Sequence, residues 1–310
     1  MQTILGAGGA IGNELARALT HYTNDIRLVS RTPQKVNPDD QKFPADLTRA
    51  DETRRAIQGS EIVYLTAGLP YKTKLWESTW PVIMQNVIDA CVEEGAKLVF
   101  FDNIYLYSGD NLNPIVEDSP VNPPSKKGVV RAKLVKMIWD AVENRNLKAV
   151  IARCADFYGP NVKDVSLLTE LVLVPLSEGK TANWLVNDKV KHAFTFTEDA
   201  GRATALLGNS PEAYGQAWHL PTAQNPPTGK EWVEMAAQVL GVKPKYRVVS
   251  KGMVKFLGIF VPIMRSIHEM LYQYDKDYVF NSAEFEKTFS YTPTPYRKGL
   301  EKVVQMQFRK

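Results

Sequence analysis

The sequence predicts an α/β fold in which a parallel, doubly wound sheet is followed by a smaller C-terminal lobe. A glycine-rich turn separates a β-prone run from a helical run at the very start of the chain. Strand-like and helix-like segments then alternate through residue 101 with short connections, which requires parallel strands and right-handed crossovers. Residues 62–65 form a continuous apolar run, as in strands that are buried on both faces.

Composition excludes several classes of protein. The 310 residues are enough for one large domain or two closely joined ones, and 44% hydrophobic residues can fill a core. A net charge of +4, spread over interspersed acids and bases, is too diffuse to indicate a nucleic-acid partner. The four histidines lack metal-ligand spacing, so no metal site is expected.

Location is inferred from three features. The strand and glycine turn leave no room for a secretory signal at the start of the printed sequence. Cys91 and Cys154 fit reduced thiols in the core of a cytoplasmic protein. The apolar stretch Met253–Ile267 contains Lys255 and Arg265 and is too short to span a bilayer, so we expect a buried or interfacial helix and no membrane association.

The glycine turn has the spacing needed near a phosphate ligand. Gly6 would let the chain turn off the first strand, and Gly12 would let the next helix lie close to the sheet. Gly9, which lacks a Cβ, would let the backbone approach a pyrophosphate. The main-chain N–H groups of the helix start, at Ala10 and Ile11, would face the phosphates. The alternative is that these glycines serve only the fold, as glycine-rich turns do in other α/β proteins.

The end of the second strand bears on which dinucleotide would bind. Residues 26–29 read as a strand followed by Ser30 and Arg31, where an NAD-binding fold commonly has an acidic residue for the ribose hydroxyls. A hydroxyl and a guanidinium suit a 2′-phosphate instead, which favours NADP over NAD. Arg31 could equally be an exposed loop residue.

Two further loops would lie at the same edge of the sheet. Asp46 follows an expected third strand at 42–45, where its carboxylate could accept a hydrogen bond from an adenine amino group. It could equally cap the helix expected over residues 49–58. After the fourth strand at 62–65, the small residues Thr66, Ala67 and Gly68 would let a cofactor ribose lie close.

The later elements are read from apolar periodicity and from capping residues. Thr228 and Glu231 form a capping-box pattern at the start of a helix that ends near Gly241. The other expected helices cover residues 80–94, 126–144, 167–176 and 198–207, and the other expected strands cover residues 97–101, 150–153, 181–187, 192–197, 217–220 and 245–249.

With these segments in place, the chain resembles the extended branch of the short-chain dehydrogenase/reductase superfamily, the NAD-dependent epimerase/dehydratases. The resemblance implies a Rossmann-like NAD(P)-binding domain of residues 1–160 and 188–222, with a substrate-binding lobe of residues 161–187 and 223–310. It adds Leu47 and Asn86 to the expected cofactor contacts. The residues that carry it are Gly6-x-x-Gly9-x-x-Gly12, Asp46-Leu47, Asn86 to Cys91, Tyr105-Leu106-Tyr107, Arg153 to Pro160 and Phe194 to Ala200.

The chain departs from the catalytic pattern of that family, which has a Ser or Thr after the fifth strand and a Tyr-x-x-x-Lys on the next helix. Lys133 matches the lysine, which in the family holds the nicotinamide ribose, but Val129 stands where the tyrosine would be. Asn103 takes the Ser/Thr position, and an amide cannot accept a proton at neutral pH. Asp156 stands where the family has an asparagine.

Three explanations of this departure remain open. A nearby side chain could replace the tyrosine, and the candidates are Tyr71, Tyr105, Asp156 and Tyr158. The chemistry could need no phenol. The protein could also bind the dinucleotide without turnover. The ribose-binding role of Lys133 is favoured by its register with the apolar stripe of the helix, which consists of Val130, Leu134, Met137, Ile138 and Ala141. Lys133 could instead belong to a solvated face, because it lies in a basic stretch over residues 126–136.

The resemblance therefore implies a cytoplasmic NAD(P)-dependent oxidoreductase or epimerase/dehydratase that acts on a small molecule with a carbonyl or hydroxyl group, of nucleotide-sugar type. The alternative is a non-catalytic NAD(P)-binding regulator or redox sensor. By the same resemblance, two copies could form a homodimer through the helices near residues 80–94 and 126–144.

Overall fold

The computed structural model describes residues 1–162, 165–260 and 262–308. These fall into two compact units. Unit 1 comprises Met1–Leu106, Lys126–Cys154 and Ala200–Leu220. Unit 2 comprises Tyr107–Ser125, Ala155–Asp199 and the described residues from Pro221 onward. The division into functional domains inferred from the sequence stays a prediction.

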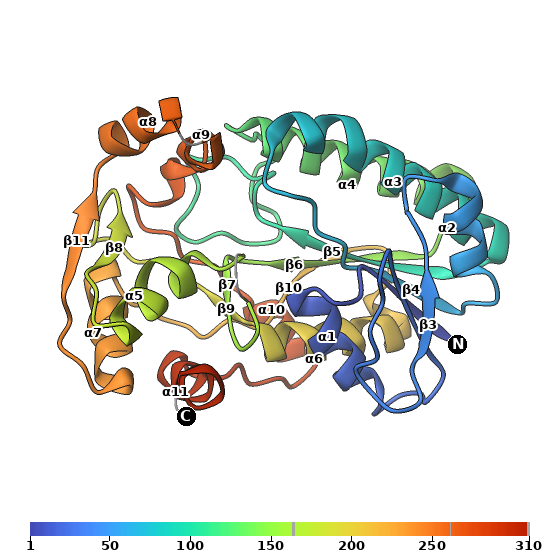
Figure 1. Cartoon of the computed structure of the whole chain (residues 1–310). Coiled ribbons are helices and arrows are strands. Elements are labelled where there is room, and N and C mark those ends of the chain that lie inside the picture. The colour runs from blue at the N-terminus through green and yellow to red at the C-terminus, as the bar shows by residue number, and fades with distance from the viewer. Residues whose placement is uncertain (163–164, 261, 309–310) are drawn as a thin grey trace. The chain divides into compact units, whose positions relative to one another are not determined.

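Unit 1 is built on a parallel sheet, so the predicted α/β fold is confirmed (Figure 1). Its strand order is β10-β6-β5-β4-β1-β2-β3. From β1 the strands β2 and β3 are added on one side, and β4 and the later strands are added on the other side, so the strand order switches beside β1. This switch is where open α/β sheets bind ligands, beyond the carboxyl ends of their strands. The strands are β1 Gln2–Leu5, β2 Ile26–Ser30, β3 Gln41–Pro44, β4 Ile62–Leu65, β5 Lys97–Asn103, β6 Ala149–Cys154 and β10 Ala217–His219.

Helices cover both faces of this sheet (Figure 1). On one face α2, α3 and α4 pack side by side, and α1 and α6 lie on the other. A Cβ added to Gly201 of α6 would lie 2.7 Å from the backbone of Glu14, so the α1 and α6 backbones approach closely there. The bounds are α1 Ala10–Leu19, α2 Ala50–Ile57, α3 Thr73–Glu94, α4 Lys126–Arg145 and α6 Thr197–Asn209.

Helix α3 begins earlier than predicted. It starts at Thr73 and continues through Pro81, whereas the sequence indicated a start near Trp80. Proline is most often found in the first turn of a helix, which is why the pattern around Pro81 read as a beginning. The additional turns contain Thr73 and Trp76, which contribute to the site described below.

Unit 2 contains two small parallel strand pairs and a set of helices around an aromatic core. Strand β7 Phe157–Tyr158 pairs with β9 Thr195–Phe196, and β8 Ala182–Leu185 pairs with β11 Tyr246–Val249. The predicted strand over 192–197 is therefore shorter than expected. The helical segments include a π-helix at Thr169–Leu173, α5 Val174–Ser177, α7 Gly229–Leu240, α8 Lys251–Phe260, α9 Pro262–His268, α10 Ala283–Thr288 and α11 Tyr296–Gln307.

Helix α8 is more exposed than the sequence indicated. Val254 and Gly258 are buried, but Phe256, Ile259 and Phe260 are 61%, 62% and 70% exposed. The buried alternative is thus wrong for most of this segment, because an apolar composition by itself does not identify a covered surface, and the interfacial alternative stays a prediction. No helix in the described part of the chain is long and apolar enough to cross a bilayer.

Candidate functional site

The glycine turn joins the end of β1 to the start of α1. Gly6 has φ = +104°, and a Cβ there would lie 2.4 Å from the main chain of Ala67. A Cβ on Gly12 would lie 2.9 Å from the carbonyl oxygen of Gly6. These two glycines therefore let the turn fold back on itself and lie against the loop that follows β4.

Gly9 has a different environment. It is exposed, has φ = −76°, and is the N-cap residue of α1. Because glycine has no side chain, it cannot cap the first N–H groups of the helix, which begins at Ala10 and Ile11. The positive end of the α1 dipole thus points to the carboxyl edge of the sheet, and this is an anion-binding arrangement.

The loops after β2 and β3 lie next to each other. Ser30 pairs in register with Pro44, and the N–H of Ala45 donates to the Ser30 carbonyl at 3.0 Å. Ser30 is half-buried and the guanidinium-bearing Arg31 is exposed. Ser30 and Arg31 therefore lie at the carboxyl edge of the sheet, where the glycine turn also lies.

Asp46 makes the hydrogen bonds of a local turn. Its Oδ1 accepts from the main-chain N–H of Thr48 at 2.9 Å and from the Thr48 hydroxyl at 2.8 Å. These two bonds, together with the charges of Arg31 and Arg49, hold the pKa of Asp46 below its usual value. The carboxylate is half-exposed, so this turn, just before α2, leaves it accessible.

Two more of the predicted cofactor residues are held by hydrogen bonds within unit 1. Asn86 of α3 donates from Nδ2 to the carbonyl of the buried Leu47 at 2.9 Å, which ties the loop after β3 to the helix. Thr66 donates from Oγ1 to the Leu5 carbonyl at 3.3 Å, and Gly68 beyond it is exposed. The structure thus brings the predicted cofactor residues other than Lys133 to the carboxyl ends of adjacent strands.

Helix α4 has a register that the basic stretch did not reveal. Lys133 is exposed, so its predicted register with the apolar stripe is wrong, and Val129 is 57% exposed. The charged residues on the buried side are Lys127 and Arg131, which are four residues apart and lie on one face with Leu134 and Ile138. Lys127 is 0% exposed. The helical spacing of Lys127 from the apolar residues Leu134 and Ile138 was the sequence signal that could have identified it as buried.

Lys127 lies in an aromatic cluster at the carboxyl ends of β4 and β5. Its Nζ donates to Thr73 Oγ1 at 3.1 Å and lies 4.2 Å from the centroid of the Tyr71 ring. The Tyr71 hydroxyl donates to the hydroxyl of Tyr105 at 3.4 Å. Trp76 stacks on Tyr105 and meets Tyr71 edge-on. The cluster combines a cation, two phenols and a hydroxyl.

Asn103 positions Tyr105, since its Oδ1 accepts from the Tyr105 main-chain N–H at 3.1 Å. The preceding residue, Asp102, binds two buried arginines. Its Oδ1 lies 2.7 Å from Nε of Arg131, and its Oδ2 lies 3.2 Å from Nε of Arg153. This ion triad joins β5, α4 and β6.

The predicted site residues of unit 2 are Asp156 and Tyr158. Asp156 Oδ2 accepts from the Tyr274 hydroxyl at 3.2 Å and lies 3.1 Å from Nε2 of His192. His192 is buried, and its ring stacks between Tyr274 and Tyr278 at centroid distances of 4.3 and 4.4 Å. Asp156 therefore belongs to a packed hydrogen-bonded network within this unit.

Tyr158 is fully buried in the aromatic core of unit 2. Its hydroxyl donates to the main-chain carbonyl of Tyr296 at 3.3 Å, and Gly299 leaves the space that its ring occupies. Burial, and the nearby Tyr296, raise the pKa of the Tyr158 hydroxyl well above its usual value. This placement indicates a packing role for the side chain.

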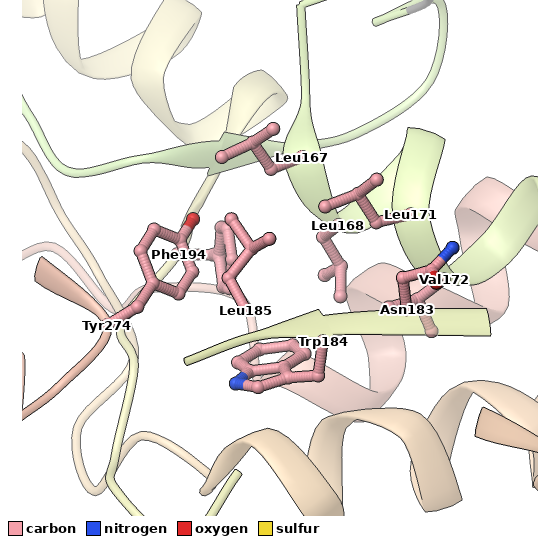
Figure 2. Close-up of a pocket in the computed structure, with 9 residues that line it drawn as sticks. All are labelled: Leu167, Leu168, Leu171, Val172, Asn183, Trp184, Leu185, Phe194 and Tyr274. Carbon is pink, nitrogen blue, oxygen red and sulfur yellow. The ribbon is translucent and has the colours of Figure 1, made fainter. Parts of the chain in front are cut away.

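A small apolar cavity of about 10 Å³ also lies in unit 2 (Figure 2). A volume of this size holds about one water molecule and cannot admit a metabolite. It is lined by Leu167, Leu168, Leu171, Val172, Asn183, Trp184, Leu185, Phe194 and Tyr274. Among the described residues, no three His, Cys, Asp or Glu side chains form a group that could hold a metal ion.

The family model "NAD dependent epimerase/dehydratase family" matches residues 3–219 of the chain, a span that begins at β1 and ends with β10. The chain belongs to this family. The resemblance inferred from the glycine turn and the later motifs is therefore confirmed.

Among curated proteins, this chain is 24% identical over 196 residues to 3beta-hydroxysteroid-dehydrogenase/decarboxylase isoform 2 of Arabidopsis thaliana. That match covers 58% of this chain but 34% of the plant protein, so the chain spans about a third of its relative. Isoform 1 of the same plant enzyme is 22% identical, with 97% of this chain and 78% of the enzyme covered.

Among solved structures, the UDP-glucuronic acid 4-epimerase from Bacillus cereus in complex with NAD matches 100% of both chains with a TM-score of 0.80. The two sequences are 17% identical. This likeness establishes a common fold over the whole length of the family member.

Proposed function

We propose that this family member is an NAD(P)-dependent enzyme of the oxidoreductase or epimerase/dehydratase type, acting on the carbonyl or hydroxyl group of a small molecule. The observation that carries the proposal is the turn at Gly6–Gly12, in which an exposed Gly9 precedes the N-terminus of α1 at the carboxyl edge of the sheet. A nucleotide sugar is the proposed substrate type, because a structural relative is named as a UDP-glucuronic acid epimerase.

The residues of unit 1 fit a dinucleotide. The N–H groups at Ala10 and Ile11 would bind the pyrophosphate, and Asp46 would accept from the adenine amino group. Thr66, Ala67, Gly68 and Asn86 would border the riboses. When bound, the cofactor would supply or take up a hydride.

We propose NADP as the preferred cofactor, although the structural relative was solved with NAD. Support comes from Ser30 and the exposed Arg31, which provide a hydroxyl and a cation at the end of β2. Calorimetric titration with NADPH and NADH, repeated on Arg31→Ala, tests this. Micromolar NADPH binding that the variant selectively loses would support the assignment, whereas equal affinity for both cofactors in the wild type would contradict it.

The catalytic assignments follow the same edge of the sheet. We propose that Asn103 orients the substrate oxygen and that Tyr105 exchanges a proton with it, because both follow β5 directly. The roles of the exposed Lys133 and of the unit 2 residues Asp156 and Tyr158 stay predictions.

The second candidate function is a non-catalytic NAD(P)-binding regulator or redox sensor. It is favoured by Val129, an apolar residue in the place of the family's tyrosine. Incubation with NADPH carrying deuterium at C4 and a panel of carbonyl compounds and oxidised nucleotide sugars separates the two functions. Deuterium in a recovered alcohol supports the enzyme, and cofactor binding without transfer to any panel member supports the regulator.

A further inference from the structure

Lys127 and Arg131 occupy the two positions on the inner face of α4 that are spaced like the family's Tyr-x-x-x-Lys. The alternative pair, Val129 and Lys133, has the same spacing but lies on the exposed side of the helix. Arg131 is fixed by Asp102 and by the Phe101 carbonyl, to which its Nη2 donates at 3.0 Å. Lys127, one turn earlier on the same face, contacts Thr73 and Tyr71 instead.

The position of Lys127 is electrostatically costly. It lies in the first turn of α4, where the helix dipole is positive, and its side chain is entirely buried. The contacts to Thr73 Oγ1 and to the face of Tyr71 offset part of this cost. A charge held where it lowers stability is typical of a functional site.

The two phenols next to Lys127 are arranged as a relay. Tyr71 donates to the oxygen of Tyr105, so the proton of Tyr105 is directed elsewhere, and a negative charge formed on Tyr71 would lie close to the Lys127 ammonium. Both rings are half-buried, and Trp76 packs against both. The cluster follows β4 and β5, next to the loop of Thr66 to Gly68.

We propose that Tyr105, Tyr71 and Lys127 together form the acid–base group that takes the place of the family's catalytic tyrosine. This inference rests on the proposed function. In the direction of reduction, a bound cofactor would supply the hydride for the carbonyl carbon, and Tyr105 gives its proton to the carbonyl oxygen, so that an alcohol forms. Tyr71 passes its own proton to Tyr105. The resulting Tyr71 phenolate is stabilised by Lys127 until solvent returns a proton. Oxidation of the alcohol runs these steps backwards.

The test is an NMR pH titration of the full chain carrying ¹³Cζ-labelled tyrosine, with signals assigned through Tyr71→Phe and Tyr105→Phe. We expect the Tyr71 signal to titrate below the usual value of about 10. Lys127→Met, which is close to lysine in volume, should raise that midpoint by about one unit or more, since an opposite charge at this range has such an effect. The exposed neighbour provides the matched control Lys126→Met, which should leave it unchanged.

A variant that fails to fold does not remove the test. Circular dichroism identifies such a failure, and Lys127→Arg, which retains the charge, should then keep the low midpoint. In the wild type itself, a Tyr71 midpoint at or above the usual value of about 10 would overturn the proposal. An equal midpoint in folded Lys127→Met and in the wild type would do the same.

Cofactor binding separates this inference from the proposed function. Calorimetry with NADPH should give similar affinities for the wild type, Tyr71→Phe and Tyr105→Phe, while Tyr105→Phe lowers the rate of deuterium transfer about 10²- to 10⁴-fold. No binding of either dinucleotide by the wild type would overturn the proposed function and, with it, the catalytic role. Normal binding with full transfer by Tyr105→Phe would overturn the role of the cluster alone.

Discussion

At the scale of single residues, Gly6 and Gly9 serve different ends although the sequence spacing treats them alike. Gly6 has a positive φ and no room for a Cβ beside Ala67, so the fold itself requires glycine there. Gly9 has an ordinary φ, and a Cβ would meet its nearest neighbour, the Gly6 carbonyl oxygen, at 3.4 Å. The fold therefore leaves position 9 open to a larger residue.

We predict that Gly9→Val abolishes dinucleotide binding and leaves the fold intact, because the added methyl groups would occupy the space in which the backbone meets a pyrophosphate. Calorimetry and thermal unfolding measure the two effects. Gly6→Ala is the contrasting variant and should lower the free energy of unfolding by more than about 2 kcal/mol. Unchanged NADPH affinity in Gly9→Val would mean that the turn is only structural.

The sequence revealed the glycines but not Lys127. A basic stretch over residues 126–136 reads as a solvated helix face, and the spacing of Lys127 from the apolar positions Leu134 and Ile138 was the signal that it is buried. The contact of Lys127 with Tyr71 joins residues 56 positions apart in the chain (127 − 71). No local periodicity carries information about such a contact.

At the scale of elements, helix α7 begins with the capping box that the sequence predicted. Thr228 Oγ1 accepts from the Glu231 N–H at 3.3 Å, and the Glu231 carboxylate accepts from the Thr228 N–H at 2.7 Å. The bonds from the main chain and hydroxyl of Thr228 lower the pKa of Glu231. Both partners therefore satisfy N–H groups that the helix leaves unpaired.

We predict that Thr228→Ala lowers the free energy of unfolding by about 1 kcal/mol, as measured by urea denaturation. The contribution of Glu231 depends on pH. Its folded pKa lies below its unfolded value of about 4.3, so its stabilisation is present above that pH and is lost as the pH falls through the folded value. The destabilisation by Glu231→Ala should accordingly be smaller at acid pH than at pH 7. An equal destabilisation by Glu231→Ala at both pH values would contradict this contribution.

The ion triad of unit 1 gives the largest expected loss of stability. Asp102→Asn leaves the buried Arg131 and Arg153 without their shared carboxylate, and we predict a decrease of about 3–5 kcal/mol in the free energy of unfolding. Asp140→Asn, which removes an exposed pair with Lys136, should cost less than about 1 kcal/mol. Equal losses in the two variants would contradict the structural role of the triad.

Elements with strong local patterns could be predicted, and those shaped by packing could not. The apolar run of residues 62–65 correctly predicted the start of β4, and the capping box correctly predicted the start of α7. Residues 169–173 instead form a π-helix, whose widened turn depends on the surrounding core. The extent of β9 depends on its partner β7, which the sequence did not predict.

At the scale of the whole molecule, alternation of elements was enough to predict the sheet and, through the resemblance, the family. The substrate could not be predicted, because unit 2 contains no motif that names one. Its predicted site residues, Asp156 and Tyr158, are held by hydrogen bonds inside their own unit. Specificity in this family member therefore has to be measured.

Ligand binding should stabilise the folded chain. If NADPH binds as proposed, a concentration of 100 times its Kd should add about 2.7 kcal/mol to the free energy of unfolding and raise Tm, since the unfolded chain has no site. Scanning calorimetry with and without NADPH measures this increase. An equal rise in Gly9→Val would show that the nucleotide acts elsewhere on the protein.

A homodimer through α3 and α4 remains the proposed assembly. Val82 of α3 and Val129 of α4 are 44% and 57% exposed, and the two helices pack side by side. We predict that the wild type sediments as a dimer and that a double change to lysine, Val82→Lys with Val129→Lys, yields monomers. A wild type that sediments as a monomer would rule out this assembly.

The ion triad also limits the order in which this chain can change. If Asp102 is lost first, two buried cations face each other, whereas loss of Arg131 first leaves a carboxylate that still binds Arg153. Replacement of the triad by apolar residues must therefore begin with the loss of an arginine, and the loss of the aspartate can follow only later. The effects of changes at the three positions therefore depend on one another, and descendants of this protein should lose one of the two arginines before Asp102.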